Sequence, residues 1–166
     1  MVGGGAAGRY GDFTMTLLDS SRRNYIVLAI SLALAAVFIY AGIDKVHDPL
    51  QFADNINGFA ILPALFINLM ALGLPPFEIG CSLLLLTPWT RRVGALAVAV
   101  ITLIFLTALA SALLRGLTLD CGCFGIGAPS RPRMWLELGL DIVLFSAAAF
   151  VYVGSIARRN ALSNVN

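Results

Sequence analysis

The sequence predicts an all-α integral membrane protein in which four transmembrane helices form a bundle, and two observations carry this prediction. Hydrophobic residues make up 59% of the 166 residues and charged residues only 12%, whereas soluble domains carry about 25% charged residues. In addition, four apolar runs reach the length of about 17–25 residues that a helix needs to cross a bilayer. Backbone groups in lipid must be satisfied within their own segment, so runs of this length form helices. The expected spans are residues 25–43, 64–87, 93–114 and 134–156.

The two ends of the chain differ from these apolar runs. Residues 1–23 are polar and rich in glycine, which indicates a flexible N-terminal tail, and residues 158–166 form a short C-terminal tail. Residues 24–157 make one domain in the lipid bilayer. The net charge is only +2, and no basic stripe carries interleaved aromatic residues, so nucleic-acid binding is not expected.

The distribution of charge predicts the orientation in the membrane. Four spans put both termini on one side, and positive charge marks the cytoplasmic side. The tails and the turn at 88–92 hold seven positive residues: Arg9, Arg22, Arg23, Arg91, Arg92, Arg158 and Arg159. The opposite loops hold four: Lys45, Arg115, Arg131 and Arg133. We therefore expect a multi-pass protein of the bacterial inner membrane, with both termini in the cytoplasm and the long loops facing the periplasm.

The first outward loop contains the signature of a helix start. Asp48 offers a capping side chain, and Pro49 follows at a position where its missing N–H has no cost. Phe52, Ile56 and Phe59 then recur at helical spacing. This pattern predicts a short amphipathic helix at the outer membrane surface; a simple polar connector is the alternative.

The second outward loop contains two cysteines in the stretch LDCGCFG, residues 119–125. Cys121 and Cys123 are close enough in sequence for their Cα atoms to fall within the ~4.4–6.8 Å that a disulfide requires. A structural disulfide gains stability mainly by closing a long loop, and a one-residue loop gives almost none. Strained, exposed disulfides are the labile or catalytic ones, so a redox-active pair on the oxidising side of the membrane is the leading hypothesis.

Two other interpretations of these cysteines stay open. The first is a metal site in which Cys121, Cys123 and His47 hold a soft ion such as Cu(I). The second is that the thiols are inert or pair with other cysteines. Among the neighbouring charges, Lys45 and the arginines of the same face would favour a thiolate, whereas the adjacent Asp120 would oppose it.

Two carboxylates lie inside the predicted spans. A charge at the position of Glu78 costs about 2.5–3.5 kcal/mol on insertion scales, so Glu78 should face the bundle and be paired or protonated. Asp141 lies about a turn and a half into the last predicted span. Both could relay protons when a dithiol is oxidised; the alternatives are a protonated Glu78 bonded to a neighbouring helix and an Asp141 that reaches the interface. Cys81, near Glu78, is expected to be a small buried hydrophobic residue.

Several of these segments resemble the MauE family, a branch of the DoxX-like membrane proteins. The resemblance runs from about Ala41 to Gly125 and rests on AGIDKVHDPLQFADNI, LPPFEIG and RGLTLDCGCFG. Pro76 departs from the pattern, which has an aromatic residue there. The resemblance implies a four-helix inner-membrane protein associated with thiol–disulfide chemistry. It also implies a link to maturation of the disulfide-rich small subunit of methylamine dehydrogenase, beside a thioredoxin-like partner.

The leading functional hypothesis is therefore a thiol–disulfide oxidoreductase whose Cys121 and Cys123 exchange with a periplasmic thioredoxin-like protein. By analogy with other four-helix disulfide-forming membrane proteins, a quinone between the helices near Glu78 is one hypothesis for the electron acceptor; no other cofactor is indicated. A non-enzymatic maturation or assembly subunit and a metal-handling membrane protein are the alternatives.

Overall fold

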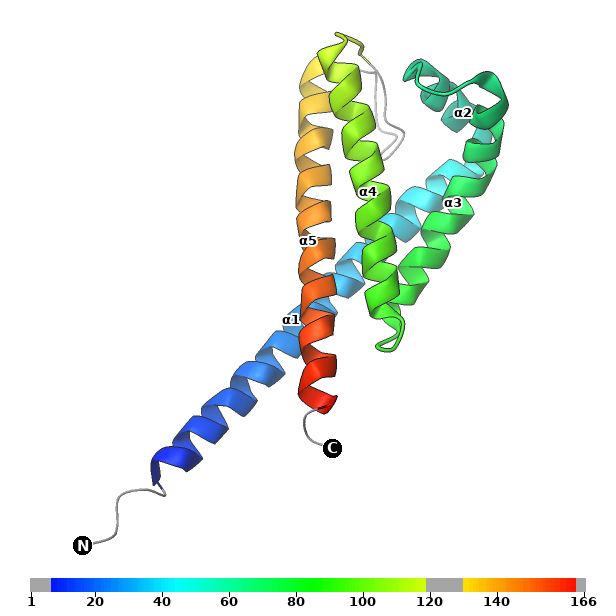
Figure 1. Ribbon diagram of the computed structural model, residues 1–166. Helices are drawn as coiled ribbons and strands as arrows, with labels where there is room; N and C mark the ends of the chain where they lie inside the picture. The colour runs from blue at the N-terminus through cyan, green and yellow to red at the C-terminus, as the bar shows by residue number, and fades with distance from the viewer. Residues whose placement is uncertain (1–6, 119–129, 164–166) are drawn as a thin grey trace, which may run out of the picture.

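The computed structural model describes residues 7–118 and 130–163, and these residues form five helices and no strand (Figure 1). The helices are α1 (Ala7–His47), α2 (Pro49–Gly58), α3 (Ala64–Leu86), α4 (Arg91–Leu114) and α5 (Arg131–Ser163). Four of them contain segments long and apolar enough to cross a membrane: Arg22–His47, Ala64–Leu86, Arg91–Leu114 and Arg131–Ile156. The predicted all-α membrane bundle is confirmed.

The four long helices pack side by side, with α1 against α3 and α5, and α4 against α3 and α5. The short helix α2 packs mainly on α3. Helices α1 and α4 end, and α3 and α5 begin, at the end of the bundle that carries α2, which is uppermost in Figure 1 and is called the α2 end below. The turn between α3 and α4 lies at the opposite end.

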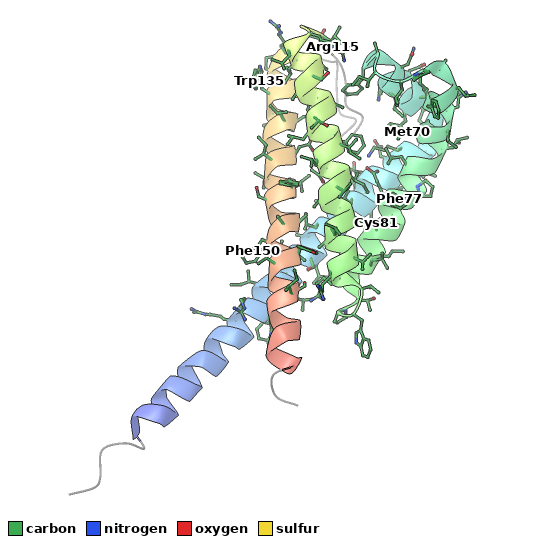
Figure 2. The ribbon with its side chains drawn as sticks, in the orientation of Figure 1. Met70, Phe77, Cys81, Arg115, Trp135 and Phe150 are labelled. Atoms are coloured by element: carbon green, nitrogen blue, oxygen red, sulfur yellow. The ribbon has the colours of Figure 1, made fainter. Side chains whose placement is uncertain are left out.

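Large apolar side chains cover the outside of the bundle. Phe77, Trp135 and Phe150 point away from the neighbouring helices (Figure 2) and are all exposed, at 56%, 63% and 46%. Apolar patches of this extent on a protein surface mark contact with another apolar phase. With four helices of spanning length, that phase is the lipid bilayer.

Two helices extend further than the sequence patterns predict. Residues 1–23 are expected to be a tail, but α1 already begins at Ala7. Residues 12–41 contain neither glycine nor proline to interrupt the helix, and it extends one turn further to include Gly8 and Gly11. Helix α5 begins at Arg131 rather than at residue 134, with Pro132 in its first turn, where proline is tolerated. It also continues to Ser163, into the expected C-terminal tail.

The predicted helix in the first loop is present as α2. The Asp48 carboxylate accepts a hydrogen bond from the Gln51 backbone N–H at 3.0 Å, and Pro49 is the first helical residue. Phe52 is its buried residue. The local capping signal is therefore sufficient to start this helix.

The half of the bundle away from α2 is closed by apolar contacts between all four long helices. Its core contains Leu34 and Phe38 of α1, Leu85 of α3, Val98 of α4 and Val151 of α5. Close approach of α3 and α4 depends on a glycine: a Cβ on Gly94 would lie 2.9 Å from the Cys81 carbonyl oxygen. Small residues allow such approach in lipid, where packing drives helix association.

Candidate functional site

A buried ion pair joins α1 to α3. The Lys45 Nζ lies 2.8 Å from the Glu78 Oε2, and the two side chains are 2% and 1% exposed. The same ammonium lies 5.4 Å from the centroid of the Phe52 ring and 5.3 Å from that of Phe105. Both distances are within the range of about 6 Å in which a cation is attracted to an aromatic face. The sequence patterns single out both charged residues but do not pair them.

The position of this pair follows from the contact between α1 and α3. A Cβ on Gly42 would lie 2.7 Å from the Ile79 side chain and 3.3 Å from the Pro75 carbonyl oxygen, so α1 approaches α3 closely here. Lys45 is three residues further along α1 and therefore meets Glu78. Glu78 is about 21 Å along α3 from Ala64, at 1.5 Å per residue. This places Glu78 in the interior of a spanning helix, where it meets Lys45 from the last turn of α1.

A second set of charges follows one face of α5. Arg133, Glu137 and Asp141 are spaced four residues apart, so they lie one above the other along the helix. The Arg133 Nε lies 3.2 Å from the Glu137 Oε1. Glu137 and Asp141 are 5% and 6% exposed. The second Glu137 oxygen, Oε2, is buried and has no hydrogen-bond partner in the described part of the chain.

The two sets of charges meet at a small cavity of about 20 Å³. Lys45, Glu78 and Asp141 line it, together with Thr102 of α4 and apolar side chains. A single water needs about 10–15 Å³ of such volume and two to four polar partners. The cavity has room for about one water between the ion pair and Asp141. Below, "the buried polar cluster" means Lys45, Glu78, Arg133, Glu137 and Asp141.

Asp141 lies deeper than its sequence position suggests. Because α5 begins at Arg131, Asp141 is ten residues, or about 15 Å, from the helix start. The hydrocarbon core of a bilayer is about 30 Å thick. Asp141 therefore lies within the bundle, facing Lys45 and Glu78 across the small cavity, and not at the helix start.

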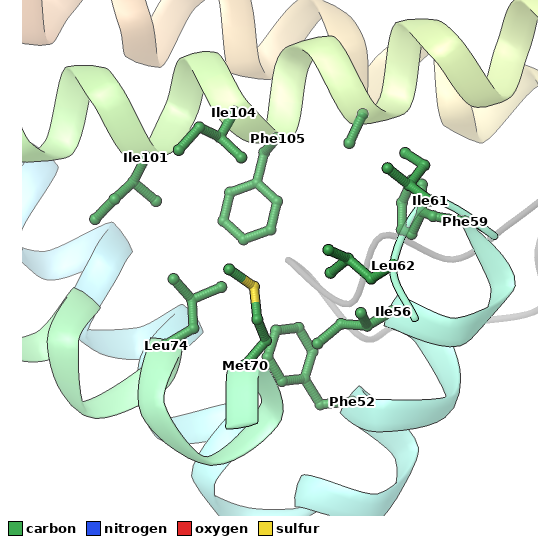
Figure 3. A pocket seen from close by; sticks show the side chains of 11 residues that line it. Phe52, Ile56, Phe59, Ile61, Leu62, Met70, Leu74, Ile101, Ile104 and Phe105 are labelled. Carbon is green, nitrogen blue, oxygen red and sulfur yellow. The ribbon is translucent and has the colours of Figure 1, made fainter. Parts of the chain in front are cut away.

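A larger cavity of about 220 Å³ lies between α2, α3, α4 and the connection from α2 to α3 (Figure 3). Its walls are formed by apolar side chains: Phe52, Ile56, Phe59, Ile61, Leu62, Met70, Leu74, Ile101, Ile104, Phe105 and Ala108. This volume is below the ~300–1,000 Å³ of typical small-molecule pockets, so a ring or a short apolar chain fits it better than a large substrate. Phe52 and Phe105 belong both to this wall and to the surroundings of Lys45.

The structure corrects the expected role of Lys45. The charge pattern predicts that Lys45 lies on the outer face, where its charge would favour a thiolate, but Lys45 is buried and paired with Glu78. The reason is that Lys45 belongs to the last turn of α1 and not to the following loop. Cys81 is buried in the apolar core, as expected, and His47 at the end of α1 is exposed.

The predicted cysteine pair falls outside the described residues, as does Asp120, since all three lie within 119–129. Leu114 and Arg131, the helix residues nearest to them on either side, both lie at the α2 end. Within residues 7–118 and 130–163, no group of three or more His, Cys, Asp or Glu side chains is arranged to hold a metal ion.

Comparison with known proteins places this architecture in a family. The family described as methylamine utilisation protein MauE matches residues 23–154, which covers nearly all of the four spanning segments. The methylamine utilization protein MauE of Paracoccus denitrificans is 32% identical over 130 residues, 78% of this chain and 69% of the relative. The protein of that name from Methylophilus methylotrophus is 31% identical over 124 residues, 74% of this chain and 63% of the relative, so less than two thirds of its length is matched. No solved structure matches. The chain is thus a multi-pass membrane protein that belongs to the MauE family.

Proposed function

We propose that this protein acts in methylamine utilisation as a thiol–disulfide exchange protein of the bacterial inner membrane. In this proposal Cys121 and Cys123 exchange with a periplasmic thioredoxin-like partner and so support maturation of disulfide-containing exported proteins. The observation that carries the proposal is the position of Leu114 and Arg131, which flank the pair and lie at the α2 end, near the buried polar cluster.

Charge supports an orientation in which the α2 end faces the periplasm. Lys45 is paired with Glu78 inside the bundle and so does not count as a surface charge. By the same criterion Arg91, which is 5% exposed and donates to the Leu85 carbonyl, does not count on the opposite side. Three positive residues then remain at the α2 end, Arg115, Arg131 and Arg133, against six in the tails and the opposite turn. Because positive charge marks the cytoplasmic side, this asymmetry favours cytoplasmic termini and a periplasmic cysteine pair.

The exchange has two steps, each the attack of a thiolate on a disulfide sulfur. The thiolate of one cysteine attacks the partner's disulfide, forms a mixed disulfide and releases the partner's other sulfur as a thiolate. The second cysteine then attacks the mixed disulfide and releases the partner's first sulfur. In this direction the pair loses two electrons and two protons and becomes a disulfide, while the partner becomes a dithiol; the reverse reaction follows the same steps.

Repeated turnover needs a second electron acceptor or donor, and we propose a lipid-soluble quinone bound in the 220 Å³ cavity. A quinone takes up two electrons and two protons to become a quinol, which matches what a dithiol gives up on forming a disulfide. The apolar wall suits a quinone ring, whose isoprenoid tail would extend out of the cavity into the lipid. Through Phe52 and Phe105 this wall adjoins Lys45 of the buried polar cluster.

Trapping the mixed disulfide tests the exchange. In Cys123→Ser, a partner disulfide attacked by Cys121 cannot be resolved, so a mixed disulfide should accumulate on non-reducing gels and disappear in the Cys121→Ser, Cys123→Ser double variant. Cys81→Ser is the matched control, because Cys81 is buried in the apolar core. It should leave trapping unchanged.

The same variants separate the other two functions. If no species is trapped and Cys121→Ser supports growth on methylamine normally, the exchange proposal is wrong and a non-enzymatic assembly subunit takes its place. If the purified protein retains copper or zinc and loses it when the thiols are alkylated, a metal site of Cys121, Cys123 and His47 replaces the exchange proposal.

The quinone proposal has its own test. Ala108→Phe would fill part of the cavity wall and should slow reduction of a short-chain ubiquinone analogue by the reduced protein at least tenfold. Ala36→Phe places the same side chain at an exposed position on α1 and should leave the rate unchanged. Equal rates in the two variants would place quinone reduction elsewhere, even where trapping of the partner succeeds.

A further inference from the structure

The buried polar cluster does not balance its charges. It contains three carboxylates, Glu78, Glu137 and Asp141, and two cations, Lys45 and Arg133. All but Arg133 are at least 94% buried, and the Arg133 side chain is 20% exposed. If every carboxyl were ionised, one negative charge would be in excess inside the bundle. An uncompensated buried charge is so costly that the group usually takes up a proton instead.

No neighbouring cation can remove this excess. On α1, Asp44 and His47 are exposed, and α4 contributes only Thr102, whose hydroxyl donates to the Val98 carbonyl at 2.8 Å. Arg115 is exposed and donates to the Phe59 carbonyl, away from the cluster.

The remaining neighbours leave the balance unchanged. On α2 the charged residues, Asp48 at its start and Asp54, are acidic and exposed, and Arg131 on α5 is also exposed. The sequence of residues 119–129 contains no lysine, arginine or histidine and one aspartate. Any charge from that segment would therefore increase the excess.

Two further observations point to a proton as the missing positive charge. The Glu137 Oε2 is buried without a hydrogen-bond partner among the described residues, so one oxygen of the cluster has room for a proton. The cavity of about 20 Å³ lies between Asp141 and the Lys45–Glu78 pair and has the size of a single water. In the described chain, the carboxylates do not gather as ligands of one metal ion.

We propose that the buried polar cluster is a proton-binding site that holds one exchangeable proton, shared between Glu137 and Asp141. The proton enters from the α2 end along α5, where the partly exposed Arg133 contacts Glu137. It reaches Asp141 one turn further on and faces the ion pair across the small cavity. Glu78 already has the Lys45 ammonium at 2.8 Å, so we assign the exchangeable proton to the two carboxyls of α5.

This site would also serve the proposed function, and that part rests on the proposal above. Oxidation of two thiols to a disulfide releases two protons, and reduction of a quinone consumes two. A proton site next to the apolar cavity, below the helix ends that flank the cysteines, would connect these two reactions. The proton-binding site itself requires neither the cysteines nor the quinone.

Infrared spectroscopy of the full-length protein in lipid nanodiscs tests the site directly. At neutral pH, the wild-type spectrum should contain the C=O stretching band of one protonated carboxylic acid, which disappears as pH rises. The single variant Asp141→Asn should remove the band or transfer it to Glu137. The double variant Asp141→Asn with Glu137→Gln should remove the band in either case. Asp54→Asn, an exposed carboxylate on α2, is the matched control and should leave the band unchanged.

A stability measurement checks the same site independently. A folded state that binds one more proton than the unfolded state loses stability as pH rises. The unfolding midpoint of the wild type should therefore fall between neutral and alkaline pH, and that of the double variant should fall less. The Asn and Gln side chains remove charge, so the variants should fold, which their helical circular dichroism would show.

The proposal is overturned if the wild type has no protonated carboxyl band at neutral pH, or if the band survives in the double variant. The Cys121→Ser, Cys123→Ser variant distinguishes this result from failure of the proposed function. Its band should equal that of the wild type even though disulfide exchange is abolished.

Discussion

The two halves of the bundle are built from different interactions. Away from α2, the four long helices meet through side chains such as Leu85, Val98 and Val151, which are fully buried in a continuous apolar core. Towards α2, the helices meet around the buried polar cluster, with a small cavity beside it and an apolar cavity under α2. The first half has an apolar core, and the second contains buried charges with a cavity on either side of Lys45.

The two halves of the bundle therefore have different roles: one stabilises the fold, and the other holds the ionisable residues. In lipid, helices associate mainly through close packing, which the apolar half provides. Ionisable residues within a membrane are costly and usually mark a functional site. The polar half therefore keeps charges that packing alone does not require, while the apolar half holds the helices in register around them.

The largest expected effect comes from breaking the ion pair. Lys45→Met leaves the Glu78 carboxylate buried without its partner at 2.8 Å. Removing one member of a buried pair costs about 3–5 kcal/mol. The free energy of unfolding, measured with a chaotrope in mild detergent, should fall by that amount.

The double variant sharpens this result. In Lys45→Met with Glu78→Met both charges are absent, and apolar replacements of buried pairs are often neutral or stabilising. Most of the lost stability should return. If the two substitutions were additive instead, the pair would not be the source of the loss, and the contrast between the two halves would be wrong.

A smaller loss is expected in the apolar half from Gly94→Ala. The added methyl would lie 2.8 Å from the Leu85 backbone nitrogen and 2.9 Å from the Cys81 carbonyl oxygen, and backbone atoms cannot move aside as a side chain can. Overpacking of this kind costs about 1–3 kcal/mol. The thermal unfolding midpoint should fall accordingly.

Gly80→Ala is the matched control on α3. Apart from the adjacent residues and the backbone of its own helix, a methyl there would meet no atom of the described chain within 4 Å. Replacing an unconstrained helical glycine by alanine stabilises by about 0.5–1 kcal/mol. If Gly94→Ala and Gly80→Ala changed the unfolding midpoint equally, the packing of α3 against α4 would not depend on close contact at Gly94.

Local signals were enough to predict most of the fold. The four apolar runs are confirmed as spanning helices, and Asp48 with Pro49 correctly predicts the start of α2. Each of these features depends on residues that are close together in the sequence. The early start of α1 was missed because the polar residues 12–24, which contain neither glycine nor proline, still continue the helix that follows them.

The site was less predictable because it depends on contacts between helices. Lys45 and Glu78 were both singled out, but their pairing follows from the position of Gly42 against Pro75, which no local pattern contains. Glu137 was not predicted as a member of the cluster, because a favourable contact with the helix dipole is enough to explain a glutamate near a helix start; it is 5% exposed. Cys121 and Cys123 lie outside the described residues, and their role remains a prediction.

The smallest expected effect tests whether α2 belongs to the polar half. Asp48→Ala removes the acceptor of the Gln51 N–H bond, and loss of such a cap costs about 0.5–2 kcal/mol. Because Phe52 of α2 lies against the Lys45 ammonium, part of this loss should disappear when Asp48→Ala is introduced into Lys45→Met, as a double-mutant cycle of unfolding free energies would show. Asp54→Ala, at an exposed position of the same helix, should change stability by less than about 0.5 kcal/mol. Complete additivity between Asp48 and Lys45 would instead mean that α2 caps the bundle without supporting the ion pair.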